Sequence, residues 1–148
     1  MFSFDWVMGA LTPFDGVQAA IQPNRETFRA VGYSLLTNLA EKQLRNEQPA
    51  IIDCVTRMPV FERWQQLAQQ YKSDLRVIEC IVSDEAIHRS RIEGRVRAIP
   101  GWRELKWEYV AQARAEFEPL DTKKLVLDAV EPFTDNLARV REYLGVSA

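Results

Sequence analysis

The sequence predicts an α/β domain built on a parallel β-sheet. Short apolar runs alternate along the chain with longer segments that have helical periodicity. The short runs are apolar along their whole length, which is typical of parallel strands covered by helices on both faces. The 148 residues, with 47% apolar and 27% charged residues, suit a globular chain of one domain. We therefore expect a single domain over residues 1–148.

Four segments are predicted as strands. The most apolar is residues 75–82, whose β-branched content and length favour a strand over a helix. Two others end in an acid, Asp5 in the short apolar start of the chain and Asp53 in the run that follows Pro49. The predicted strands are residues 2–5, 50–54, 75–82 and 124–128.

Helices are predicted between and after these strands. Asn24 can cap a long helix, and Pro59 can sit in the first turn of the next one. Gly145 can end the last helix. The apolar face of the long helix is predicted as Phe28, Val31, Leu35 and Leu39. The predicted helices cover about residues 24–46, 59–71, 84–97, 102–117 and 133–144.

Composition excludes several classes of protein. Lys and Arg number 19 against 21 Asp and Glu, so the net charge of −2 argues against a general nucleic-acid binder. No apolar run has the roughly 20 residues of a membrane span, and the start is a poor secretory signal, so we expect a cytoplasmic protein. Cys54 and Cys80 are expected to be free, buried thiols. With the single His88 they do not supply the four ligands of a zinc site.

Acids stand at or near the ends of three predicted strands, where open parallel sheets bind their ligands. Asp53 follows an apolar run, a context in which an acid holds magnesium through water. The alternative is a structural acid that caps the next turn. Asp5 can orient or deprotonate a substrate hydroxyl, or it can simply cap the helix that follows. Asp128 is expected to be structural.

Residues 88–97 hold four arginines and one acid. Arg91 and Arg95 are four positions apart, so on a helix they would share a face and could bind phosphate oxygens. Arg89 and Arg97 could assist them. The alternative is a solvated helix face. The interpretation of this segment as an RNA-binding patch has less support, because the chain is acidic and no aromatic residues interleave with the arginines. His88 is expected at the surface or at the edge of this segment.

Taken in order, three segments resemble the small P-loop kinase-like ATPases of the AAA-domain type, the group of zeta-toxin and chloramphenicol phosphotransferase. The segments are FSFDWVMGAL, AIIDCVTRMPVFERW and LRVIECIVSDEAIHRSRIEGR. The resemblance implies a three-layer α/β/α parallel sheet with an arginine-bearing lid at about residues 84–117. It also places an acceptor-selecting insertion at about residues 12–23.

The function implied by the resemblance is phosphoryl transfer from ATP, with Mg²⁺, to the hydroxyl of a small molecule. Asp5 would serve the acceptor and Asp53 would stand at the magnesium. Arg91 and Arg95 would act on the phosphates, with Arg89 and Arg97 beside them at the nucleotide. The expected partners are therefore a nucleotide and a small-molecule substrate, without a membrane and without nucleic acid.

The sequence departs from this family at its phosphate-binding motif, G-x-x-x-x-G-K-[ST]. None of the lysines follows a glycine, so the motif does not occur in the 148 residues. We expect the chain to begin just after that central strand, loop and helix, which by ordinary lengths span about 25–35 residues. These 148 residues alone would then have little or no kinase activity. The other hypothesis is a non-catalytic relative that binds a protein partner or an anion through its arginines.

Overall fold

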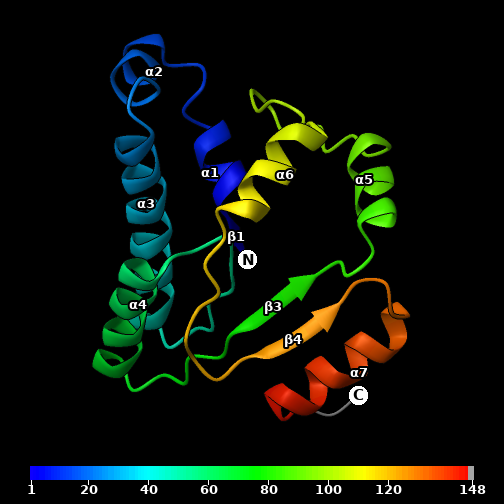
Figure 1. Cartoon of the computed structure of the whole chain (residues 1–148). Helices are drawn as coiled ribbons and strands as arrows, with labels where there is room; N and C mark the ends of the chain where they lie inside the picture. Colours follow the sequence, from blue (N-terminus) through cyan, green and yellow to red (C-terminus); the bar gives the residue numbers. More distant parts are fainter. Residues whose placement is uncertain (147–148) are drawn as a thin grey trace. The chain divides into compact units, whose positions relative to one another are not determined.

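The structure is a computed structural model that describes residues 1–146 (Figure 1). Its helices and short parallel strands confirm the α/β class. The elements are β1 (Phe2–Ser3), α1 (Phe4–Gly9), α2 (Asp15–Ile21), α3 (Arg25–Arg45), β2 (Ile52–Asp53), α4 (Met58–Gln70), β3 (Ile78–Ile81), α5 (Glu85–Glu93), α6 (Trp107–Ala115), β4 (Leu125–Asp128) and α7 (Phe133–Leu144). None of the helices within residues 1–146 combines the length and the apolarity that a bilayer crossing requires.

The chain forms two compact units. Unit 1 contains Met1–Asp74 together with Arg97–Glu104. Unit 2 contains Leu75–Val96 and the residues from Leu105 on. The segment 97–104 therefore packs with unit 1, although the residues on both sides of it pack with unit 2.

Each unit has one parallel strand pair. In unit 1, β1 pairs with β2 so that Ser3 lies opposite Asp53. In unit 2, β3 pairs with β4 so that Ile81 lies opposite Asp128. All four predicted strands are present but shorter than predicted. Each has a ladder partner on one side only among the described residues. Among the described residues each sheet has two strands, so these residues alone do not form the larger sheet that the resemblance implies.

Helix α3 confirms the long predicted helix but not its predicted apolar face. The Asn24 side chain accepts hydrogen bonds from two backbone N–H groups of the first turn, at 2.9 and 3.0 Å, as a helix cap should. Leu36 and Ala40 are buried, whereas Leu39 is 37% exposed. The predicted face is therefore wrong by about one position, because the contacts with α1 and α4 decide which side of the helix is buried.

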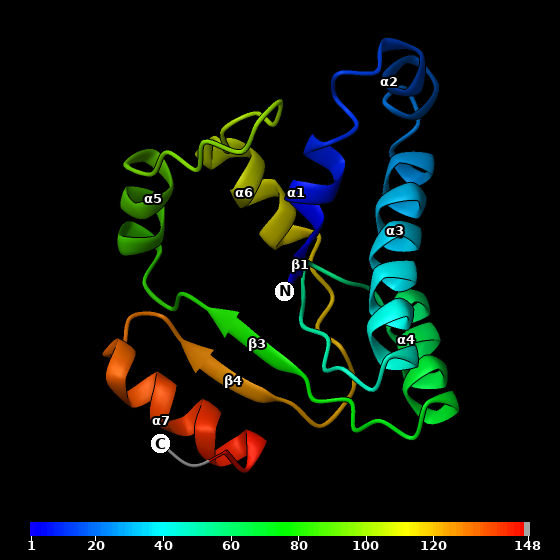
Figure 2. The same cartoon turned by 180° about the vertical axis from the view of Figure 1, so that it is seen from behind.

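Helices α3 and α4 lie side by side (Figures 1 and 2), and a chain of hydrogen bonds that begins at Trp64 of α4 fixes them together. The Trp64 indole N–H donates to the hydroxyl of Thr37 at 2.9 Å, and this hydroxyl donates to the carbonyl oxygen of Tyr33 at 2.7 Å. The Tyr33 hydroxyl in turn donates to the carbonyl oxygen of Val55 at 2.6 Å. Buried polar groups are thus satisfied, and the segment after β2 is fixed against α3.

Helix α1 packs on α3 at a glycine. A methyl group at Gly32 would lie 2.2 Å from the ring of Phe4, so this close approach requires the missing side chain. The Phe4 ring also lies against two aromatic rings of α3, with centroids 6.1 Å from Phe28 and 5.3 Å from Tyr33. This contact sets the direction in which α1 leaves β1.

Unit 2 is organised around β3 and β4, with α7 packed along β4 (Figures 1 and 2). Gly145 adopts a left-handed conformation with φ of 69° and ends α7, as predicted. The helix predicted over residues 84–97 extends too far at its C-terminal end, and the helix predicted over residues 102–117 begins too early. Helix α5 ends at Glu93 with Gly94 as its cap, and α6 begins only at Trp107. Most of the residues between them form the loop that belongs to unit 1.

We predict opposite effects for two glycine substitutions in helices. Gly32→Ala should lower the free energy of unfolding by about 1–3 kcal/mol, because the added methyl group collides with Phe4. Gly16→Ala should raise it by up to about 1 kcal/mol, because an added methyl group at Gly16 meets nothing within 4 Å. Urea unfolding of both variants measures the difference. Equal stabilities would contradict the packing of α1 on α3.

Candidate functional site

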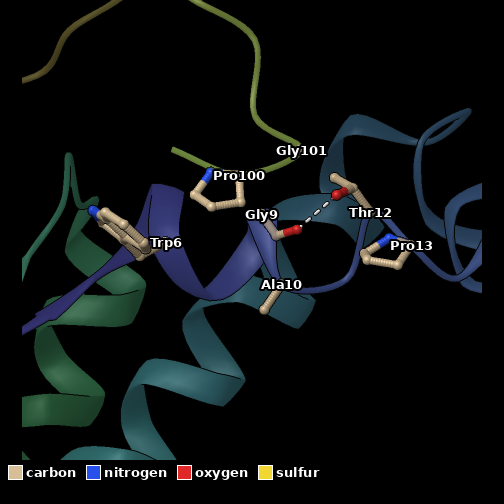
Figure 3. A pocket seen from close by; sticks show the side chains of 7 residues that line it. All are labelled: Trp6, Gly9, Ala10, Thr12, Pro13, Pro100 and Gly101. Carbon is tan, nitrogen blue, oxygen red and sulfur yellow. Dashed lines mark hydrogen bonds between the residues drawn. The ribbon is translucent and has the colours of Figure 1, made fainter. Parts of the chain in front are cut away.

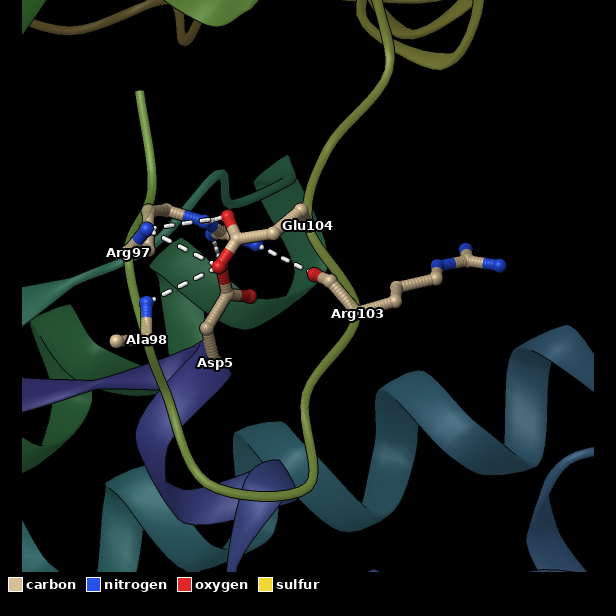
Figure 4. A network of polar contacts seen from close by, with 5 residues as sticks. All are labelled: Asp5, Arg97, Ala98, Arg103 and Glu104. Atoms are coloured by element: carbon tan, nitrogen blue, oxygen red, sulfur yellow. Dashed lines mark hydrogen bonds and ion pairs between the residues drawn. The ribbon is translucent and has the colours of Figure 1, made fainter. Parts of the chain in front are cut away.

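Asp5 is held by an arginine that lies far from it in the sequence. The carboxylate, in the first turn of α1, forms an ion pair with the guanidinium of Arg97 (Figure 4). The two side chains are 31% and 13% exposed. Ser3 occupies the N-cap position of α1, so the alternative that Asp5 is a plain helix cap is wrong.

Glu104 fixes Arg97 at the base of the 97–104 loop. Its carboxylate accepts hydrogen bonds from the backbone N–H groups of Arg97 and Ala98, both at 3.0 Å, and lies 3.6 Å from Nε of Arg97. The guanidinium also donates to the carbonyl oxygen of Arg103 at 2.9 Å. The hydrogen bonds from the backbone, that of Arg97 foremost, lower the pKa of Glu104. Arg97 was predicted to assist at the nucleotide, but in this structure its guanidinium is committed to Asp5.

The tip of the same loop docks on α1 and α3 through glycines and an aromatic stack. A methyl group at Gly9 would lie 2.9 Å from the carbonyl oxygen of Pro100. Gly101 has a φ of 70° and lies so close to Thr12 that a methyl group would overlap the hydroxyl. The Trp102 ring stacks on Phe28 with centroids 5.9 Å apart. The loop is therefore a packed part of unit 1.

Asp53 ends β2, at the same sheet end as Asp5. It is exposed, and no hydrogen bond or ion pair to its carboxylate occurs within residues 1–146. The alternative that Asp53 caps the turn after β2 is therefore not supported by the described residues. Those residues also contain no group of three or more His, Cys, Asp or Glu side chains suited to a metal ion. A magnesium ion at Asp53 would take its other ligands from water and phosphate oxygens, which is a common arrangement for this ion.

Cys54 follows Asp53, and its thiol is partly buried. Burial, with a contribution from the charge of Asp53, raises the pKa of Cys54 to about 12. Neither Cys54 nor Cys80 forms a disulfide, as predicted. Cys80 is exposed, so the prediction that it is buried is wrong. It lies on β3, which has a strand neighbour on one side only.

In unit 2, the arginines of the 88–97 segment have separate environments. Arg91 donates to the carbonyl oxygen of Ala129 at 2.8 Å, just beyond the end of β4. Arg95 is exposed and lies after α5 has ended, so the predicted helix face shared by Arg91 and Arg95 is wrong. Arg89 pairs with Glu93 at 2.8 Å on the exposed surface, as the solvated-face alternative expects.

Three arginines and one glutamate nevertheless act on His88, and Glu85, which lies 3.9 Å from Arg114, opposes the effect of the arginines. Burial lowers the pKa of this histidine, and the positive charges of Arg114, Arg95 and Arg91 lower it further. The imidazole meets the Trp107 ring edge-on, with centroids 5.4 Å apart. The sequence did not lead us to Arg114, which lies on α6. The feature of the sequence that could have indicated it is its position in the helix that follows the arginine-rich segment. We name Arg91, Arg95 and Arg114 the arginine cluster.

Asp128 is structural, as predicted. Its carboxylate accepts hydrogen bonds from the backbone N–H groups of Ser83 at 3.2 Å and Val130 at 3.0 Å. Hydrogen bonding from Ser83, followed by that from Val130, lowers the pKa of Asp128. The acid thus joins the segments that follow β3 and β4, and it holds the sheet end at which Arg91 lies.

Comparison of the chain with protein-family models, with curated proteins and with solved structures finds no match. The resemblance to P-loop kinase-like ATPases therefore rests on the sequence segments and remains a hypothesis. The geometry of the two groups of candidate residues is independent of it.

We predict that Cys54 resists alkylation. At pH 8 a thiol with a pKa of about 12 is almost entirely protonated, so it should react with iodoacetamide at least about a hundredfold more slowly than an ordinary cysteine. The Cys80→Ser variant leaves Cys54 as the sole thiol, and Cys54→Ser is the matched control. Mass spectrometry follows both, in native buffer and in guanidinium chloride. Equal native rates would show that the end of β2 is open.

Proposed function

We propose that this protein takes part in ATP-dependent phosphoryl transfer to the hydroxyl group of a small molecule. One observation carries the proposal: each unit has a candidate residue or residues at the carboxyl end of its parallel strand pair. Asp5 and Asp53 follow β1 and end β2, and Arg91 contacts the residue after β4. This end of a parallel sheet is where such folds bind their ligands.

Asp5 is the residue proposed to receive the acceptor hydroxyl. Its carboxylate is partly exposed and its orientation is fixed by Arg97. A fixed carboxylate can accept a hydrogen bond from a hydroxyl and orient the oxygen for attack on phosphorus. The exposed Asp53 is proposed as an outer ligand of the magnesium that accompanies the phosphates.

The arginine cluster is proposed to bind the phosphates. Arg95 and Arg114 are exposed, although Arg114 lies 3.9 Å from the carboxylate of Glu85. The bond of Arg91 to Ala129 uses one of the five N–H groups of its guanidinium. Guanidinium groups bind phosphate oxygens in pairs and neutralise charge during phosphoryl transfer. His88 beside them is held towards its neutral form, because a further positive charge there is unfavourable.

The phosphate cradle itself is proposed to come from a strand, loop and helix outside these 148 residues. The open edges support this, since every strand in the described residues has a partner on one side only. The larger sheet of the resembling family would require at least one further parallel strand. We expect the 148 residues alone to bind ATP weakly and to have little turnover.

The second candidate function is a non-catalytic module that binds anions through the arginine cluster. It is favoured by the cluster itself, which unit 2 assembles from its own residues. The two candidates differ in selectivity. Phosphoryl transfer requires preference for a nucleoside triphosphate, whereas a simple anion site accepts phosphate or sulfate equally well.

The titration of His88 tests the proposal, because this is the single histidine of the chain. Phosphates bound at the arginine cluster should cancel the positive charge that lowers the pKa of His88, so ATP with Mg²⁺ should raise this pKa. Proton NMR follows the imidazole signal between pH 4 and pH 8. We expect at least tenfold weaker binding of inorganic phosphate and sulfate than of ATP.

Two variants with the same change in net charge control this experiment. Arg95→Gln should weaken the effect of ATP, whereas Arg141→Gln on α7 should leave it unchanged, because Arg141 is not among the charges that act on His88. Equal effects of ATP, phosphate and sulfate would favour the anion-binding module. No shift of the His88 pKa with ATP would contradict the proposed phosphate site.

A further inference from the structure

Unit 1 has an open pocket with a volume of about 360 Å³ (Figure 3). One of its lining residues, Trp6, directly follows Asp5 in the sequence. One wall is α1 with the turn that follows it, and the other is the tip of the 97–104 loop. The lining residues are Trp6, Gly9, Ala10, Thr12, Pro13, Pro100 and Gly101. Pockets of this size hold small molecules or their rings.

The lining of this pocket is uncharged and mostly apolar. Apart from the indole N–H of Trp6, its polar side-chain group is the hydroxyl of Thr12, which already donates its hydrogen to the carbonyl oxygen of Gly9 at 2.7 Å. Trp6 is 55% exposed, and the rings of Pro13 and Pro100 border the same space (Figure 3). Flat apolar surfaces of this kind suit the face or edge of an aromatic ring, whereas a charged group would find no partner here.

The pocket is formed in advance of any ligand. Gly9 and Gly101 allow the loop to lie directly on α1, and a methyl group at either position would collide with the opposite wall. Arg97 and Glu104 close the base of the loop. A pocket with fixed walls avoids the entropy cost of ordering a loop when a ligand binds.

We propose that this pocket binds an uncharged aromatic ring of the acceptor, so that the substrate class is an aromatic compound carrying a free hydroxyl. The hydroxyl part of this inference rests on the proposed function. Asp5 and Trp6 are adjacent on α1, and the loop that walls the pocket is the loop whose base contacts Asp5. The same two elements thus present the acid for the hydroxyl and the apolar surface for the ring.

Binding of 2-phenylethanol tests the ring site without ATP, so failure of phosphoryl transfer does not affect the result. The chain has four tryptophans, and their indole N–H signals in a ¹H–¹⁵N spectrum can be followed separately, with that of Trp6 assigned from Trp6→Phe. The probe should shift the signal of Trp6 and leave that of Trp64, which is buried and bonded to Thr37, unchanged. Myo-inositol and phenyl phosphate should bind at least tenfold more weakly.

Substitutions on the two sides of α1 complete the test. Ala10→Leu should fill the pocket and weaken binding of 2-phenylethanol at least tenfold, and Trp6→Ala should also weaken it, as detected by saturation transfer to the probe. Phe14→Ala removes an aromatic ring that is 58% exposed but does not line the pocket, so it should have no effect. An unshifted Trp6 signal, unchanged affinity in Ala10→Leu, or preference for phenyl phosphate would each overturn the proposal.

Discussion

The ion pair between Asp5 and Arg97 is the interaction on which the candidate site depends. It joins the start of the chain to a loop more than ninety positions later, and both side chains are partly shielded from water. Such a pair is screened less than a surface pair. Through it the 97–104 loop lies on α1, orients the Asp5 carboxylate and forms a wall of the pocket beside Trp6. It also helps explain why α5 and α6 stop short of each other, because most of the residues between them pack with unit 1.

The two units carry complementary chemistry. Unit 1 presents carboxylates at the end of its parallel pair, together with an uncharged pocket. Unit 2 presents the arginine cluster, around a histidine that is held towards its neutral form. Carboxylates can accept a hydrogen bond from a hydroxyl group and can coordinate magnesium, and guanidinium groups bind phosphate oxygens. Phosphoryl transfer from ATP to a hydroxyl uses both kinds of group, and the proposal of that reaction rests on the presence of both in the chain.

Local patterns in the sequence were enough to predict the strands, the cap at Asn24 and the helix end at Gly145, because each depends on neighbouring residues. The structural role of Asp128 was also predictable from its place at a strand end. The buried face of α3 was not, because the contact of Phe4 with Gly32 comes from another element. The environments of Arg95, Arg97 and Arg114 depend on where α5 ends and on which unit takes the 97–104 loop. These environments are set by tertiary contacts, which the periodicity of the sequence does not reveal.

A double-mutant cycle on Asp5 and Arg97 tests the central claim most directly. The variants are Asp5→Asn, Arg97→Gln and the combination, with the free energy of unfolding measured in urea. The account predicts a coupling energy of at least about 1 kcal/mol between the two positions. The exposed i,i+4 pair of Arg89 and Glu93, treated in the same way, should show a coupling of no more than about 0.5 kcal/mol. Effects at Asp5 and Arg97 that simply add would contradict the claim that this ion pair holds the loop on α1.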